Sequence, residues 1–198
     1  DALERQLRPR SLGHACLLLV RSRARSRLQL HEQATADGLR AHAIATELQA
    51  RDARIEAAFQ LSTTFRRAGL LDQALEFADE AIAGSRASGQ KAALATALFG
   101  RAQILDDLQR ADDALQTIGE SRQLSVELGD AVGRAFADNE TCAILLAMRR
   151  IDAAEASCRA AYAGFTATGR VDQASGTQSR LARIELLRRR PAAALAWL

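Results

Sequence analysis

The nearest approach to a catalytic motif lies at His31, Glu32 and Thr35. The zinc-protease motif H-E-x-x-H needs two histidines four residues apart on one helix face, and threonine stands where the second histidine would be. His31 and His42 share a helix face, but eleven residues separate them by roughly 16 Å, too far for one ion. No G-x-S-x-G, G-x-x-x-x-G-K or G-x-G-x-x-G motif occurs. The sequence therefore predicts no catalytic residue, no metal and no cofactor.

Three cysteines, Cys16, Cys142 and Cys158, are the other reactive side chains. Their odd number and wide spacing argue against a disulfide framework and favour a reducing cytoplasm. Cys142 and Cys158 fall in columns of small residues, so the first interpretation is a buried thiol that packs as a small apolar group. A redox role or a fortuitous disulfide is the alternative.

Composition limits the classes of protein that remain. The chain has 198 residues, of which 48% are hydrophobic and only 4% aromatic, and it has two prolines. With so few prolines, almost the whole chain can be helical. The many alanines allow helices to pack closely against one another. The net charge of +3 comes from 27 basic and 24 acidic residues, with no polybasic run, so nucleic acid is not an expected partner. The longest apolar run, residues 15–20, is far shorter than the ~20 residues that cross a bilayer, and no membrane partner is expected.

A ladder of small residues recurs every 40 positions, and this is the strongest signal in the sequence. The alanines of the ladder are Ala34, Ala74, Ala114, Ala154 and Ala194, and seven residues further on stand Ala41, Ala81, Ser121 and Ala161. Residues seven apart lie on one helix face, so the ladder predicts a seam of close helix contact.

Acidic residues and glycines keep the same step. The acids Glu32, Asp72, Asp112 and Asp152 each stand two residues before a ladder alanine, at an expected helix start, where a carboxylate can cap N–H groups and meet the helix dipole. Pro191 stands at the corresponding start of the last helix. Glycines at 89, 129 and 169 suit the left-handed residue that ends a helix.

These signals divide the chain into helices without a strand pattern. The expected helices are 11–27, 31–48, 53–67, 72–87, 91–107, 112–127, 131–147, 152–167, 171–188 and 191–198. Residues 1–10 resemble the tail of a preceding repeat. Because the chain begins at Asp1 and stops within an apolar helical pattern at Leu198, we expect it to be a piece of a longer protein.

The pattern resembles the tetratricopeptide (TPR) repeat family over nearly the whole chain. The second repeat carries the resemblance most clearly, with Leu61, Phe65, Gly69, Leu71, Ala74, Ala78 and Ala81 at the family's apolar, glycine and alanine positions. The resemblance implies an all-α, right-handed superhelical solenoid of antiparallel helix pairs. It would be one domain over residues 1–198, with repeats at 11–50, 51–90, 91–130, 131–170 and, in part, 171–198.

Two features depart from the family pattern. The period is 40 residues where 34 is usual, and Arg21 and Arg25 replace apolar residues in the first repeat. That first helix is expected to be shifted, or to pack on something absent from this chain. Forty-residue variants resemble the sensor regions of bacterial signalling proteins, such as GGDEF diguanylate cyclases and activators similar to the maltose regulator.

In such a solenoid the first helix of each pair lines the concave face. The expected lining side chains, and the predicted site, are Arg23, Arg27, Phe59, Thr63, Arg66, Phe99, Gln103, Asp106, Asn139 and Arg183. The phenylalanines would anchor an apolar side chain, the polar residues would hydrogen-bond an extended peptide, and the arginines would attract carboxylates. The competing interpretation makes the arginines a solvated helix face and the phenylalanines packing between repeats. A clamp for chaperone tails is disfavoured because Lys91 is the only lysine.

The sequence thus predicts a non-catalytic, cytoplasmic protein-interaction module, the regulatory segment of a multidomain bacterial signalling protein. Its partner would be a protein or peptide, including an output domain of its own parent chain. The alternatives are a receptor that closes around a small molecule or peptide signal, and a structural scaffold or dimerisation rod that forms a homodimer.

Overall fold

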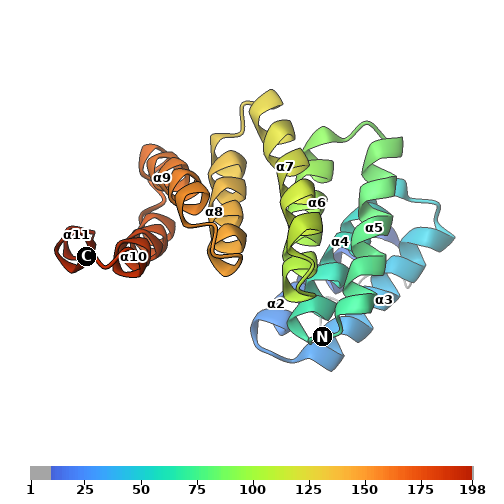
Figure 1. The fold of residues 1–198 in the computed structure, drawn as a ribbon. Coiled ribbons are helices and arrows are strands. Elements are labelled where there is room, and N and C mark those ends of the chain that lie inside the picture. Colours follow the sequence, from blue (N-terminus) through green and yellow to red (C-terminus); the bar gives the residue numbers. More distant parts are fainter. Residues whose placement is uncertain (1–9, 198) are drawn as a thin grey trace. The chain divides into compact units, whose positions relative to one another are not determined.

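The computed structural model describes residues 10–197, and in this range it contains ten helices and no strand. The helices are α2 (Leu12–Arg27), α3 (His31–Glu47), α4 (Arg51–Arg67), α5 (Leu71–Ala87), α6 (Lys91–Asp107), α7 (Ala111–Glu127), α8 (Ala131–Ala147), α9 (Ile151–Ala167), α10 (Val171–Leu187) and α11 (Pro191–Leu195) (Figure 1). The all-helical prediction is confirmed. The helix bounds agree with the expected ones to within two residues, except that the last helix ends at Leu195. The predicted tail of a preceding repeat lies, up to residue 9, outside the described residues.

Each connection between helices has three residues and ends the helix in the same way. In the first one, Leu30 N donates to Arg25 O (2.9 Å) and Gln29 N donates to Ser26 O (3.2 Å), which is the Schellman pattern. The middle residue has a positive φ, as the prediction for Gly89, Gly129 and Gly169 required. At other connections a glutamine or arginine takes this conformation, as Gln29 does at 61°. The step between such residues is 20, so the helices from α3 to α10, and not only the pairs, all have 17 residues.

The predicted capping role of the acidic residues is wrong. The N-cap positions before α3, α5, α7 and α9 are Leu30, Leu70, Arg110 and Arg150, and none of them makes a side-chain cap bond. The acids stand two positions further on, inside the first turn, where a carboxylate meets the helix dipole but cannot reach back to the free N–H groups. Within the described residues, the side chains of Ser11 and Asp130 do cap their helices.

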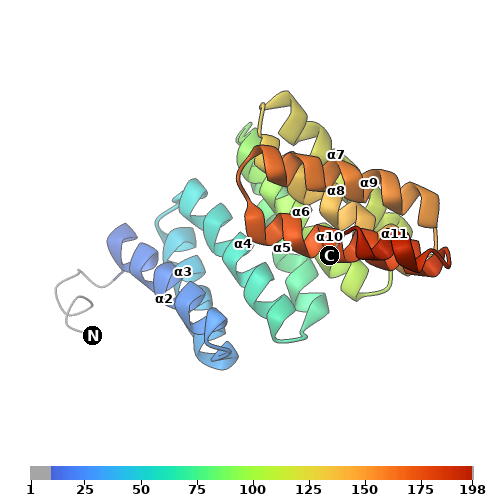
Figure 2. The same cartoon turned by 90° about the vertical axis from the view of Figure 1, so that its left-hand side faces the viewer.

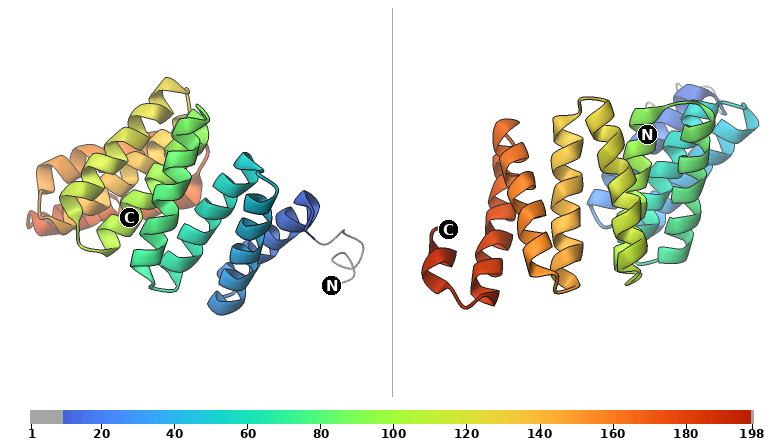
Figure 3. Two further views of the ribbon diagram at one scale, coloured as in Figure 1. Left: turned by 90° about the vertical axis from the view of Figure 1, so that its right-hand side faces the viewer. Right: turned by 45° about the horizontal axis from the view of Figure 1, so that its top comes forward.

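The chain forms two compact units, one up to Leu108 and the other from Gln109 on. In unit 1, helices α2 to α6 pack each against the next, and the first helices α2, α4 and α6 also contact one another in sequence (Figure 2). In unit 2, α7 to α11 pack in the same consecutive way (Figure 3, right). The prediction of one domain over residues 1–198 stays a prediction.

The alanine ladder is the seam between packed helices, as predicted. Ala34, Ala74, Ala114 and Ala154 are completely buried, and Ala194 is 3% exposed. A methyl group at these positions lets the backbones approach closely, and larger side chains fill the space beside it. In unit 1 these include Leu61, Phe65 and Ile104.

Helix α2 keeps its register despite Arg21 and Arg25, so the expected shift of this helix is wrong. Both guanidinium groups bind the carboxylate of Asp37 on α3. Arg21 does so through two hydrogen bonds of 2.8 Å, and Arg25 through one of 2.5 Å. Asp37 is 3% exposed. The shared carboxylate compensates one of the two positive charges inside the helix pair, and the two arginine side chains keep 19% and 28% of their surface exposed to water.

The cysteine interpretation also needs correction. Cys142 and Cys158 are both completely buried, as expected of core thiols. They face each other across α8 and α9, however, and are joined as a disulfide, while Cys16 is an exposed thiol. Their separation of 16 residues looked unspecific in sequence, but it joins opposite positions of two antiparallel helices.

Candidate binding face of the first helices

Most of the predicted site residues lie on the three neighbouring first helices of unit 1. Arg23 and Arg27 lie on α2, Phe59, Thr63 and Arg66 on α4, and Phe99, Gln103 and Asp106 on α6. Because α2 contacts α4 and α4 contacts α6, these side chains belong to one layer of helices, which we call the unit 1 face. Asn139 and Arg183 lie on α8 and α10 of unit 2.

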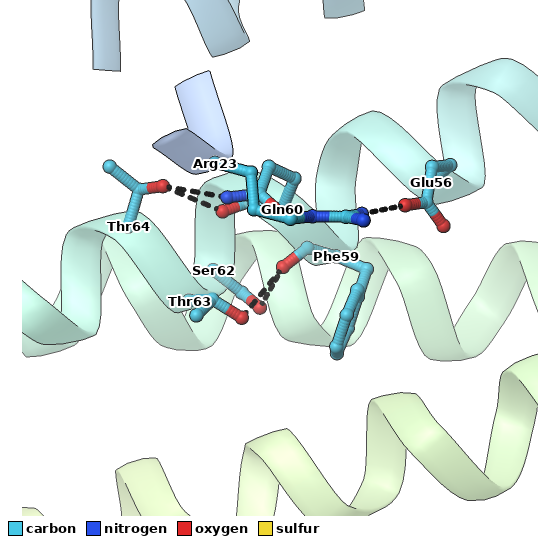
Figure 4. Close-up of polar contacts among 7 residues, drawn as sticks. All are labelled: Arg23, Glu56, Phe59, Gln60, Ser62, Thr63 and Thr64. Carbon is cyan, nitrogen blue, oxygen red and sulfur yellow. Dashed lines mark hydrogen bonds and ion pairs between the residues drawn. The ribbon is translucent and has the colours of Figure 1, made fainter. Parts of the chain in front are cut away.

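Arg23 is held by its own chain (Figure 4). One guanidinium nitrogen, Nη2, lies 2.7 Å from Glu56 Oε1, and Nε donates to Gln60 Oε1 at 3.1 Å. Gln60 in turn lies 3.4 Å from Thr64 Oγ1. Arg23 therefore bridges the first helices of repeats 1 and 2, and its charge is compensated by Glu56. It offers an acidic ligand less attraction than the sequence suggested.

The C-terminal ends of α4 and α6 carry a second compensated pair. Arg66 Nη1 lies 2.9 Å from Asp107 Oδ2. Burial, and then the neighbouring charge of Asp107, raise the pKa of Asp106 above its usual range. Arg27 is exposed and has no ion-pair partner within residues 10–197. Of the predicted attracting arginines of unit 1, Arg23 and Arg66 are thus held in ion pairs, whereas Arg27 is not.

Phe59 lines a pocket of about 240 Å³ between α4 and α6. The lining residues are Ile55, Glu56, Phe59, Ala81, Ala92, Ala93, Thr96 and Ala97. Only Glu56 is charged, and most of the other lining side chains are apolar. The Phe59 ring leans on α6 as well, since a Cβ built at Gly100 would lie 3.5 Å from Phe59 Cε2. Phe59 therefore combines both roles weighed from the sequence, packing between repeats and lining a pocket.

Thr63 stands one turn beyond Phe59 on the same helix. Its hydroxyl donates to the Phe59 carbonyl oxygen at 3.2 Å, and the Ser62 hydroxyl donates to the same atom at 2.8 Å (Figure 4). The Thr63 proton is thus used within the helix, and its lone pairs remain. Toward a ligand, Thr63 can accept a hydrogen bond, for example from a peptide N–H group.

In unit 2 the amide of Asn139 is oriented by α10. Its Oδ1 atom accepts hydrogen bonds from Thr177 Oγ1 at 3.1 Å and from Arg180 Nη1 at 2.6 Å. The carbonyl end of the amide is therefore engaged, and the NH₂ end is the group left for a ligand acceptor. Arg183, one turn further along α10, is exposed and carries no ion pair among the described residues.

The side chains that hold the predicted residues were not expected from the sequence, and they are Glu56, Gln60, Asp107, Thr177 and Arg180. The sequence does contain a signal for these partners. The side-chain hydrogen bonds between neighbouring repeats link residues 33 to 41 positions apart. In a solenoid with a 40-residue period, polar residues at that separation lie opposite each other on adjacent repeats.

Outside this face, residues 10–197 offer little that could form a metal or membrane site. Among the described residues no group of three or more histidine, cysteine or acidic side chains could hold a metal ion. No helix in the same range is long and apolar enough to span a membrane. On α9, Glu155 accepts hydrogen bonds from Arg188 and Arg159, which hold its pKa below the usual range. This network ties α9 to the end of α10.

Comparison with known proteins identifies the fold. No family model and no curated protein sequence matches the chain. Among solved structures, aspartyl phosphate phosphatase F from Bacillus subtilis superimposes with a TM-score of 0.82 at 13% identity, over 98% of this chain and 60% of the phosphatase. BtubC from P. vanneervenii gives a TM-score of 0.76 at 19% identity, over 100% and 89% of the two chains.

A third similar structure has repeats of the same type. It is a kinesin light chain protein of Podosopora anserina with nearly identical TPR-like repeats, with a TM-score of 0.77 at 13% identity, over 94% of this chain and 92% of that one. At such low identities the likeness shows the fold alone. The chain is a TPR-like solenoid of antiparallel helix pairs, as the 40-residue ladder predicted.

Proposed function

We propose that the chain is a non-catalytic protein-interaction module that binds a protein or peptide on the unit 1 face. The observation that carries the proposal is the pocket between α4 and α6, with Phe59 in its wall. Arg23 pairs with Glu56 in the wall of the pocket. Further along α4, Thr63 offers hydrogen-bond lone pairs, and Arg66 pairs with Asp107 of α6. An apolar centre within a polar rim is the usual composition of a protein interface.

The size of the pocket favours a side chain over a complete small molecule. Small-molecule sites have volumes of about 300–1,000 Å³ and enclose most of the ligand, whereas this pocket holds about 240 Å³ and has alanines on one side. A single leucine, methionine or aromatic side chain fits such a volume. The pocket therefore supports an anchor residue in a longer ligand, and we do not favour the small-molecule receptor.

The wider setting of the module is part of the same proposal. The 40-residue TPR pattern supports a regulatory segment of a bacterial signalling protein, with a GGDEF domain or a transcription activator similar to the maltose regulator as its output. A solenoid in which each repeat touches only its neighbours can transmit ligand binding as a change in pitch. An output domain of the same parent chain, or a homodimer, would then respond to that change.

A peptide selection tests the proposal and shows which side chain the pocket accepts. Peptides selected from a random displayed library on the protein are expected to share one large apolar residue. Replacing Phe59 by alanine is expected to weaken binding of the selected peptides at least about tenfold, because it removes an aromatic wall of the pocket and truncating such a contact costs more than about 1 kcal/mol.

The matched control is Leu39→Ala on α3, where Leu39 is 43% exposed on the second helix of repeat 1. This variant should bind the peptides as the unchanged protein does. If Phe59→Ala retains both its helicity and full peptide affinity, the unit 1 face is not the binding site.

A further inference from the structure

Cys142 on α8 and Cys158 on α9 form a covalent connection that the helix pair does not need for its fold. Their Cα atoms lie 5.2 Å apart, within the range of about 4.4–6.8 Å that unstrained disulfides occupy. Both residues are completely buried in one apolar cluster of unit 2, together with Leu181 and Ile184.

The second repeat shows what the same two positions require. Shifted by two repeats, Cys142 corresponds to Ser62 and Cys158 to Ala78, which are 2% and 1% exposed. These two residues pack on the seam between α4 and α5 without a bond. A small side chain at each position is therefore sufficient for the helix pair, and cysteine at both positions of one repeat adds a chemical property.

We propose that Cys142 and Cys158 are a reversible redox pair that clamps α8 to α9. The oxidant is a low-molecular-weight disulfide such as oxidised glutathione. One cysteine thiolate attacks it, forms a mixed disulfide and releases one glutathione thiol. The second cysteine thiolate then displaces the other glutathione. Two protein thiols become one disulfide, and the two electrons and two protons that they lose reduce the small disulfide to two thiols.

The burial of both sulfur atoms determines how the pair responds. A small disulfide reaches either thiol only when α8 and α9 separate locally, so exchange is expected to be slow in the folded protein and fast in denaturant. Once formed, the bond closes a loop of 16 residues and restricts the unfolded chain. The oxidised state of unit 2 is therefore the more stable one.

The chain contains its own reporter for this unit. Its single tryptophan, Trp197, and its single tyrosine, Tyr162, both belong to unit 2. Their rings meet edge to face at 5.6 Å, beside the cluster that holds the two cysteines. Tryptophan fluorescence thus follows the unfolding of unit 2 and not of unit 1, where neither residue occurs.

The experiment counts thiols and measures the midpoint of thermal unfolding. After equilibration with oxidised glutathione and transfer to denaturant, one reactive thiol per chain is expected, and after dithiothreitol three. The midpoint followed by Trp197 fluorescence should be higher in the oxidised protein by about 10 °C or more. Three thiols in the oxidised sample, stable glutathione adducts on Cys142 or Cys158, or equal midpoints would overturn the proposal.

Three variants make the result specific. Cys142→Ser and Cys158→Ala copy the residues of repeat 2, so they should fold, and their midpoints should not depend on redox state. Cys16→Ser removes the exposed thiol and should retain the full shift in midpoint. A shift that disappears in Cys16→Ser and persists in Cys142→Ser would assign the effect to Cys16 and contradict the proposed pair.

Discussion

Repeats 1 and 2 place opposite chemistry at the same three positions of the helix pair. Repeat 1 has Arg21, Arg25 and Asp37, joined by three charge-assisted hydrogen bonds. Forty residues on, repeat 2 has Leu61, Phe65 and Phe77, and the two phenylalanine rings stack with centroids 5.5 Å apart and planes 11° apart.

The difference shows which part of the repeat specifies the fold. Both pairs keep the seam alanine, Ala34 or Ala74, completely buried, and both have nearly the same helix lengths. The side chains that fill the space beside this seam, which we call the filling, are ionic in repeat 1 and aromatic or aliphatic in repeat 2. A buried ion pair gains little net stability, because desolvation of the charges offsets their attraction, whereas aromatic burial is favourable without that cost. Repeat 2 is therefore expected to contribute more stability to unit 1 than repeat 1.

The largest effect is expected from removing the aromatic filling. Phe65 is 7% exposed and stacks on Phe77, so Phe65→Ala should lower the free energy of unfolding by about 3–5 kcal/mol. Urea unfolding followed by circular dichroism measures this change. Leu39→Ala, at an exposed position of the same unit, should change the value by less than about 0.5 kcal/mol. A loss below about 1 kcal/mol for Phe65→Ala would show that the ring is not part of the stabilising core.

Breaking the ionic filling should have the next largest effect. Asp37→Ala leaves Arg21 and Arg25 without their shared carboxylate, while their side chains stay 19% and 28% exposed. Uncompensated charge in such a site costs about 3 kcal/mol. The same urea titration measures it. An unchanged midpoint would mean that both guanidinium groups turn to water at no cost.

Replacing the ionic filling by the aromatic one tests the comparison directly. The triple variant Arg21→Leu, Arg25→Phe and Asp37→Phe gives repeat 1 the residues of repeat 2. We expect it to be more stable than the unchanged protein by about 1–2 kcal/mol, as found when buried ion pairs become well-packed apolar groups. A less stable variant with full helicity would show that the Asp37 cluster has a net stabilising role.

The smallest effect is expected at the ion pair between the two repeats. Arg23 and Glu56 are each about half exposed, at 49% and 50%, so Arg23→Gln should cost no more than about 1 kcal/mol. Because salt screens exposed pairs, the difference from the unchanged protein should vanish at ~1 M salt. A difference that persists at high salt would indicate that the hydrogen bond to Gln60, and not the charge, joins the repeats.

The fold was predictable from sequence because its signals repeat. The ladder from Ala34 to Ala194 fixes the period, the burial of the seam and the helix bounds, and each column confirms the others. The capping role of Asp72 and its equivalents could not be predicted, because a shift of two residues within a turn changes which N–H groups a carboxylate reaches. Equivalent positions in successive repeats show on which helix face a residue lies. They do not show with which neighbouring group its side chain forms a hydrogen bond or an ion pair.

For the same reason, the sequence predicted the helices that carry the site residues but not the partners of those residues. Arg23 and Phe59 lie on the expected helices, but the pairing of Arg23 with Glu56 depends on how far an arginine reaches across to the next repeat. Cys142 and Cys158 were within reach of prediction. The helix bounds put them on consecutive antiparallel helices, and the midpoint between them, residue 150, falls in the connection of α8 and α9. Residues whose numbers are nearly symmetric about such a connection lie close together. Such symmetry, applied to every pair of helices, would have brought the two cysteines together.

The uniform connections have a consequence for how this chain can be rebuilt. A residue with positive φ follows each helix, as Gln29 and Gly69 do after α2 and α4, and the next helix begins two residues later. Removing the segment from residue 30 to residue 69 would therefore join Gln29 to Leu70 in a connection that already exists in the protein. The connections are equivalent to one another, so whole repeats can be deleted, duplicated or exchanged at them without the design of a new loop.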